Sequence, residues 1–194
     1  MLDEQALATF TDRHTIVYER WYPHEIDLVF EAVSTDEHLD VWMLPESRVE
    51  RRLGGTCAFG WGGPVDDTSG DHGTVTVFDP PTTVEYTMRD ESFMRFDLDE
   101  KDGGTRLRFT LHFLPDPGGN VEQPYPGGDL PAGADSAWRP GFLAGYHEFL
   151  GDLRPFLKGE FTAADRTAML EHPEPDTDLT ERYRVYVREN CPPD

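Results

Sequence analysis

One histidine in the sequence is placed where it could carry acid–base chemistry. His147 is followed by Glu148 and lies beside a stripe of apolar residues at helical spacing. A histidine titrates near neutral pH, so within a cavity it can accept or donate a proton. On the flank of a helix, the same side chain more often bonds to a carbonyl group or to water. The sequence favours this structural role for His147 and leaves the catalytic role open.

Two groups of acidic residues invite comparison with metal sites. A calcium loop needs oxygen ligands at positions one, three and five and glycine at position six. Counting from Asp97 and Asp99, Lys101 takes the fifth position and Gly103 comes one residue late, so we predict a charged hairpin turn. The second group lies within one loop, at Asp66, Asp67, Asp71 and His72. A single loop seldom closes a metal site, and the sequence predicts no metal and no cofactor.

Standard catalytic signatures are absent from the sequence. It contains no Gly-x-Ser-x-Gly elbow, no phosphate-binding Gly-Lys-Ser/Thr, no His-Glu-x-x-His and no Gly-x-Gly-x-x-Gly after a strand. Cys57 and Cys191 form no Cys-x-x-Cys pair, and we expect a buried thiol at the first and a free thiol at the second. An enzyme would have to use scattered polar residues, so the sequence favours a binding protein.

The charge of the chain narrows the range of its partners. Its net charge is -21, and Lys101 and Lys158 are its only lysines. Such a surface repels phosphate backbones and anionic lipid, which argues against nucleic acid and membranes as partners. No apolar run reaches the length of a membrane helix, and the acidic N-terminus lacks the basic and apolar regions of a signal peptide. We therefore expect a cytoplasmic protein.

The spacing of apolar residues predicts an α+β fold. Weak helical character over residues 1–14 is followed by a strand at 15–21 and two short helices within 28–42. About six antiparallel strands should follow between residues 49 and 113. The clearest strand alternates Leu107, Phe109, Leu111 and Phe113 with polar residues. Residues 115–133 hold five prolines and five glycines, a composition typical of a loop.

A long amphipathic helix is predicted from Trp138 to Leu157. Its apolar stripe, which includes Phe142 and Tyr146, is too broad for a surface helix, so this helix must lie in a groove. Beyond it the chain is acidic, with a short helix near residues 163–170 and a final helix near residues 179–187. This tail can pack on its own domain or on a second subunit, which leaves a homodimer open.

Several short motifs occur in a characteristic order. They are Tyr18-Glu19-Arg20-Trp21-Tyr22-Pro23-His24, Ser34-Thr35-Asp36-Glu37-His38-Leu39 with Trp42, Glu50-Arg51-Arg52-Leu53-Gly54-Gly55, Asp79-Pro80-Pro81, Gly103-Gly104-Thr105-Arg106-Leu107 and Gly145-Tyr146-His147. With this order and spacing, residues 15–159 resemble the bacterial members of the family named for the activator of the heat-shock-protein-ninety ATPase, in the SRPBCC (START-like) superfamily. The resemblance implies a helix-grip fold, in which a curved antiparallel sheet wraps around the long C-terminal helix. The expected domain spans residues 1–159, followed by an acidic, partly helical extension, 160–194.

The resemblance also implies a cavity between the sheet and the long helix. Alternation along the strands and helical spacing give its expected lining as Trp42, Phe59, Trp61, Tyr86, Phe96, Phe109, Phe113, Phe142, Tyr146 and His147. The same aromatic residues could instead fill a solid core. The leading hypothesis is a protein that binds an apolar or aromatic small molecule. A cyclase- or hydrolase-like enzyme of the same superfamily and a co-chaperone-like partner module are the alternatives.

Overall fold

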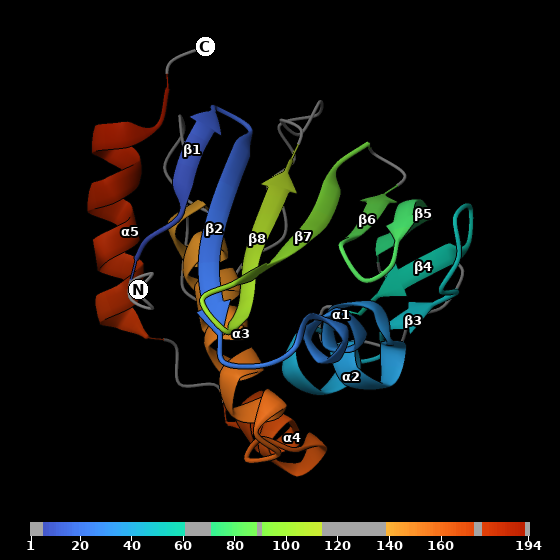
Figure 1. The fold of residues 1–194 in the computed structure, drawn as a ribbon. Helices are drawn as coiled ribbons and strands as arrows, with labels where there is room; N and C mark the ends of the chain where they lie inside the picture. The colour runs from blue at the N-terminus through green and yellow to red at the C-terminus, as the bar shows by residue number, and fades with distance from the viewer. Residues whose placement is uncertain (1–5, 61–70, 89–90, 114–138, 173–175, 193–194) are drawn as a thin grey trace.

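The computed structural model describes residues 6–60, 71–88, 91–113, 139–172 and 176–192, whose strands form one antiparallel sheet (Figure 1). Its order is β1-β2-β8-β7-β6-β5-β4-β3, so the pairing of β2 with β8 joins strands far apart in the sequence. The strands are β1 (Thr9–Asp12), β2 (Thr15–Tyr22), β3 (Arg48–Val49), β4 (Thr56–Phe59), β5 (Asp71–Asp79), β6 (Thr83–Met88), β7 (Phe93–Lys101) and β8 (Gly104–His112).

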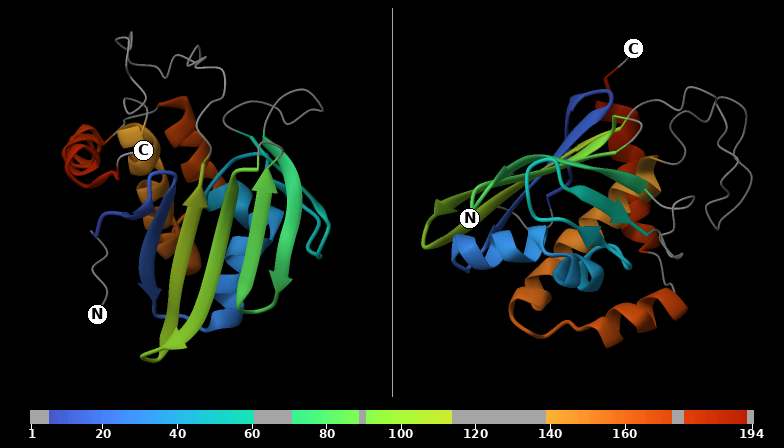
Figure 2. Two further views of the ribbon diagram at one scale, coloured as in Figure 1. Left: turned by 90° about the horizontal axis from the view of Figure 1, so that it is seen from above. Right: turned by 90° about the vertical axis from the view of Figure 1, so that its right-hand side faces the viewer.

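Three helices cover one face of the sheet (Figure 2). They are α1 (Ile26–Ser34), α2 (Asp36–Trp42) and α3 (Arg139–Leu157), and α4 (Ala163–Glu171) and α5 (Thr177–Asn190) follow them. Along β6, buried Val84, Tyr86 and Met88 alternate with less buried neighbours, as a strand with one covered face requires. A curved antiparallel sheet against a long helix is the α+β helix-grip architecture that the sequence predicts.

The N-terminal segment differs from the sequence prediction. Residues 1–14 were expected to have weak helical character, but Thr9–Asp12 form β1, an edge strand paired with β2. Four residues are too few to display a clear alternation, and the free edge of β2 supplies the hydrogen bonds that favour a strand. The first of the strands expected after residue 49 is also short, because β3 contains only Arg48 and Val49.

The segment around β1 is held in place by α5, which packs on the flank of α3. The backbone amide of Ala8 donates a hydrogen bond to the hydroxyl oxygen of Tyr183, at 3.1 Å. The rings of Phe10 and Tyr186 stack with their centroids 5.9 Å apart. Residues near the two ends of the chain therefore pack against each other, and α5 also covers the flank of α3.

Residues 97–103, which were compared above with a calcium loop, contain the hairpin turn between β7 and β8. Its two residues, Asp102 and Gly103, have φ values of 52° and 75°, as a type I′ hairpin turn requires. Asp99 forms an ion pair with Arg106 at 2.8 Å, and Asp97 forms one with Arg95 at the same distance. These carboxylates neutralise arginines on the sheet surface, so the prediction of a charged hairpin is confirmed.

Both cysteines are free thiols, as the sequence predicts. Cys57 lies on β4 and is buried, and its burial raises the pKa of the thiol to about 12. It is therefore a small core residue that stays protonated at neutral pH.

One buried arginine fastens α4 to the rest of the fold. The Arg166 side chain donates from Nε to the carbonyl oxygen of Val41 at 2.9 Å and from Nη2 to that of Trp42. It also forms an ion pair with Asp152 of α3, at 2.9 Å. Burial raises the pKa of Asp152, while the attraction of Arg166 opposes that rise. One guanidinium group thus connects α2, α3 and α4.

Replacing Arg166 with methionine should destabilise the protein by about 3–5 kcal/mol, because Asp152 keeps its charge in a mostly buried place without its partner. Urea unfolding followed by circular dichroism measures this loss. The double variant Arg166→Met/Asp152→Leu removes both charges and should recover at least half of it.

The matched control is Arg184→Met, which removes an arginine from the exposed pair that it forms with Glu181 on α5. This change should alter the free energy of unfolding by less than about 1 kcal/mol. An Arg166→Met variant as stable as the control would contradict the anchoring role.

Candidate functional site

Eight of the ten residues predicted to line a cavity lie in one cluster of aromatic rings between the sheet and the helices α2 and α3. The members of this aromatic cluster are Trp42, Phe59, Tyr86, Phe96, Phe109, Phe113, Phe142 and Tyr146. Alternation along the strands brings the sheet residues to the covered face, and helical spacing turns the others toward it. Trp61 lies outside the described residues, and His147 lies apart from the cluster.

The rings of the aromatic cluster touch one another in an unbroken series. At its centre Phe96 and Phe109 stack with centroids 4.5 Å apart, and Tyr146 of α3 lies 5.5 Å from Phe109. From Tyr146 the series continues to Phe142 at 4.9 Å and then to Phe113 at 5.8 Å. Offset and edge-to-face contacts at these distances stabilise the arrangement beyond simple burial.

The opposite end of the aromatic cluster is closed by α1 and α2. Tyr86 lies 5.2 Å from Phe59 and 6.4 Å from Phe96, and Trp42 lies 6.4 Å from Phe96. The hydroxyl of Tyr86 donates to the carbonyl oxygen of Val33 at 2.9 Å, and the indole N–H of Trp42 donates to that of Ala32 at 2.8 Å. Burial also raises the pKa of Tyr86, so this hydroxyl stays protonated.

Exposure increases along the aromatic cluster toward the ends of β6 and β8. Phe59, Tyr86 and Phe96 have no exposed surface, whereas Met94 and Phe113 are 6% and 8% exposed and Phe142 is half-buried. The hydroxyl of Tyr146 lies here as well and donates to the sulfur of Met94 at 3.5 Å. We call Met94, Phe113, Phe142 and Tyr146 the open end of the aromatic cluster.

His147 faces α5 instead of the aromatic cluster. It is 7% exposed, and its Nδ1 lies 2.9 Å from the hydroxyl oxygen of Tyr183. On its other side, the ring meets Tyr18 of β2 edge to face at 6.4 Å. Burial, together with the positive charges of Arg20 and Arg182, lowers the pKa of His147 to about 4. The imidazole is therefore neutral at physiological pH and can accept the hydroxyl proton of Tyr183 at Nδ1.

A hollow of about 330 Å³ lies beside His147, where β2, α3 and α5 meet. This volume lies at the lower end of the range for small-molecule sites. We call it the polar pocket, and its lining is Arg20, Tyr22, His147, Glu148, Leu150, Gly151, Arg154, Asp176, Leu179 and Arg182. The polar pocket and the aromatic cluster are thus two separate places on α3.

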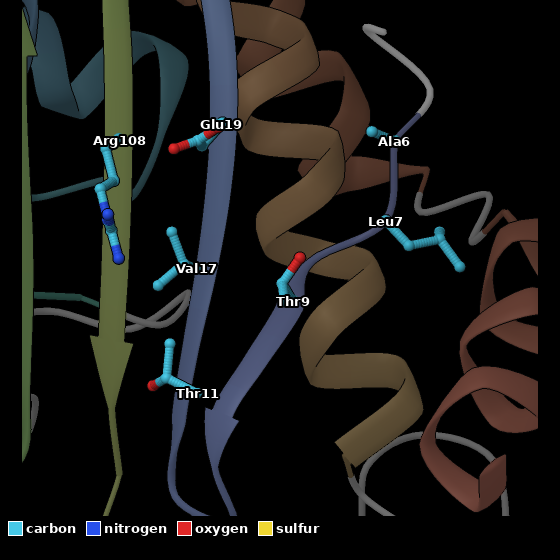
Figure 3. Close-up of a pocket in the computed structure, with 7 residues that line it drawn as sticks. All are labelled: Ala6, Leu7, Thr9, Thr11, Val17, Glu19 and Arg108. Carbon is cyan, nitrogen blue, oxygen red and sulfur yellow. The ribbon is translucent and has the colours of Figure 1, made fainter. Parts of the chain in front are cut away.

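Another hollow, of about 310 Å³, lies on the sheet face that points away from α3 (Figure 3). Glu19 of β2 and Arg108 of β8 are register partners on this face, with Val17 next to them. Ala6, Leu7, Thr9 and Thr11 form its other wall. The lining consists of short side chains and a single pair of opposite charges, so it offers few groups that could bind a ligand specifically. We therefore assign this hollow no function.

Two residues in or beside the polar pocket, Arg20 and Tyr183, were not predicted from the sequence as site residues. A signal for Arg20 was present, because it alternates with Tyr18 and Tyr22 and must share their covered face. An arginine on the covered face of a strand is unusual, because buried arginines are normally paired with another group. Tyr183 carried no comparable signal, because its role depends on where α5 docks.

The described residues contain no group of three or more histidine, cysteine or acidic side chains that could hold a metal ion. Among the helices of the same residues, none has the length and apolar character needed to cross a membrane.

The fold is similar to several solved structures. The solution structure of CalU16 from Micromonospora echinospora matches with a TM-score of 0.62 and 17% identity, covering 91% of this chain and 88% of that one. A conserved protein of unknown function from Enterococcus faecalis matches with a TM-score of 0.59 and 15% identity, covering 94% and 90%. The Aha1 dimer from Colwellia psychrerythraea matches with a TM-score of 0.50 and 18% identity, covering 75% and 97%.

The comparison with curated proteins finds no match. The comparison with family models finds one, over residues 23–125, which is more than half of the chain. This stretch contains α1, α2 and the strands from β3 to β8, the part of the molecule that carries most of the aromatic cluster. The chain therefore belongs to the family described as activator of Hsp90 ATPase homolog 1-like proteins.

Proposed function

We propose that this protein binds an apolar or aromatic small molecule at the open end of the aromatic cluster. Family membership supports a ligand-binding or partner module in general. The observation that carries the finer proposal is the unbroken series of rings that reaches Phe142 and Phe113, near Met94, where exposure increases. Aromatic rings offer a ligand large apolar surfaces, and a methionine adapts its shape to what it contacts.

The expected affinity follows from the apolar area that a ligand would bury. About 300 Å² at roughly 25 cal/mol/Å² contributes about 7 kcal/mol. The loss of translational and rotational freedom on association offsets a large part of this gain. Dissociation constants in the micromolar range are consistent with this balance. The acidic composition argues against a nucleic-acid partner.

The alternative of a cyclase- or hydrolase-like enzyme has less support. His147, its strongest candidate, lies between α3 and α5 and bonds to Tyr183. Tyr18 and Tyr86 donate their hydroxyl protons to backbone carbonyl oxygens, so neither presents a free acid or base to the aromatic cluster.

The alternative of a protein partner draws on the structure from Colwellia psychrerythraea, which is described as a dimer. Sedimentation equilibrium over a range of concentrations tests whether this chain also forms one.

The neutral fluorescent probe N-phenyl-1-naphthylamine should bind the wild-type protein saturably, with a dissociation constant in the micromolar range. Replacing Phe142 with alanine removes a half-buried ring from the open end and should weaken binding about tenfold, which corresponds to about 1.4 kcal/mol. Fluorescence titration measures both constants.

The matched control is Leu28→Ala, which removes an apolar side chain that is 43% exposed on α1. It should leave the dissociation constant unchanged. Wild-type protein that shows no saturation, or a Phe142→Ala variant with wild-type affinity, would count against the proposal.

Acidification should weaken the fold through His147. Its pKa is about 4 in the folded protein, against an ordinary value of 6.5. As the pH falls below about 6.5, the unfolded chain takes up the proton first, so stability is lost until the pH reaches about 4. Between pH 7 and pH 5 this loss amounts to about 2 kcal/mol.

A His147→Gln variant removes this contribution, so its stability should change by about 2 kcal/mol less than that of the wild type between the two pH values. Urea unfolding at each pH measures the change, and the exposed His172→Gln serves as the matched control. Equal pH dependence in wild type and His147→Gln would refute the assignment of a buried, neutral ring.

A further inference from the structure

The polar pocket contains a buried positive charge that has no counter-ion among the described residues. Arg20 is 3% exposed, although it carries a permanent charge. Its Nη1 donates to the carbonyl oxygen of Glu19 at 3.0 Å, and its guanidinium group lies 5.8 Å from the centre of the Tyr18 ring. Among the residues that the structure describes, none accepts a hydrogen bond from its buried Nη2.

A charge in such a place normally has a counter-ion. Removing a guanidinium group from water costs several kcal/mol, and buried arginines are therefore usually paired with a carboxylate. Within the described part of the chain, no carboxylate forms an ion pair with Arg20. The cation–π contact with Tyr18 compensates only a fraction of the cost.

The charges around the polar pocket favour an anion, in contrast to the molecule as a whole. Arg20, Arg154 and Arg182 all line it, in a chain with a net charge of -21. Two carboxylates, Glu148 and Asp176, are also present, so the guanidinium groups are in excess among the described residues that line the pocket.

Both carboxylates already accept hydrogen bonds from the backbone at the start of α5. Glu148 accepts from the amide of Asp176 at 3.3 Å, and Asp176 accepts from the amide of Leu179 at 2.7 Å. These bonds hold the carboxylates of Glu148 and Asp176 at the first turn of α5. The Nη2 of Arg20, in contrast, has no hydrogen-bond acceptor among the described residues.

We propose that the polar pocket is a binding site for a small oxyanion, a carboxylate or a phosphate, whose oxygen accepts the hydrogen bond that Arg20 Nη2 offers. A charge-assisted bond of this kind is about twice as strong as one between neutral groups. A volume of about 330 Å³ admits a small organic acid as well as an inorganic ion. Arg182 comes from α5 and Arg154 from α3, so the ligand would contact three elements of the fold. This site does not depend on the proposed apolar ligand, which lies on another face of α3.

Isothermal titration calorimetry of the full chain tests the proposal with two probes, sodium succinate and inorganic phosphate. The ionic strength is held constant with sodium chloride, so that general screening does not change between injections. We expect saturable binding of one equivalent of at least one probe. The probe with the lower dissociation constant indicates whether the site prefers a carboxylate or a phosphate.

Arg20→Met should lower the affinity at least tenfold. It replaces a buried charge by an apolar chain of similar length, so it should fold with at least wild-type stability in the absence of the anion. Arg182→Ala, at an exposed position of α5, should lower the affinity several-fold. The matched control is Arg188→Met, an exposed arginine of the same helix that does not line the pocket and should change nothing.

Absence of saturable binding of both probes to the wild type would overturn the proposal, as would wild-type affinity in Arg20→Met. If Arg20→Met does not fold, Arg182→Ala decides the question, and unchanged affinity in that variant overturns the proposal. Binding of N-phenyl-1-naphthylamine should be the same in Arg20→Met and the wild type, which separates this site from the aromatic cluster.

Discussion

The packing of α3 against the covered face of the sheet is the contact on which the rest of the molecule depends. The helix has an apolar stripe too wide for a surface helix, and the sheet offers an aromatic face too large to leave in water. Phe96 and Phe109 of the sheet stack on each other, and Tyr146 of α3 packs against Phe109. The hydroxyls of Tyr18 and Tyr22 donate to carbonyl oxygens of α3. Burial supplies the driving force, and these two hydrogen bonds fix the helix along its length.

The polar pocket lies outside this central contact and is bordered by α5. β1 and α5 lie outside the matched stretch of residues 23–125, as do β2 and α3. α5 packs on the flank of α3, where Tyr183 bonds to His147, and it supplies one wall of the pocket that Arg20 lines. Six of the eight residues of the aromatic cluster lie within the matched stretch, whereas every residue that lines the polar pocket lies outside it.

Sequence reasoning recovered the features that periodicity controls. A period of two fixes which face a strand residue occupies, so Phe96 and Phe109 were correctly placed together, and helical spacing brought Tyr146 to them. It did not recover β1, because four residues at a sheet edge are too few to show a period. Helical spacing correctly placed His147 on the flank of the helix, but it did not predict which residue lies opposite. That neighbour, Tyr183, is brought there by the docking of α5, a long-range contact that no local pattern encodes.

The hydrogen bond from Ala8 to Tyr183 also constrains the order in which the molecule can be completed. Its two partners are 175 residues apart in the sequence. At a synthesis rate of roughly 5–20 residues per second, β1 leaves the ribosome on the order of ten to thirty seconds before α5. During that interval the sheet edge lacks its final cover, and Arg20 remains hydrated. The polar pocket is consequently a late product of biosynthesis, formed only when the two ends of the fold meet.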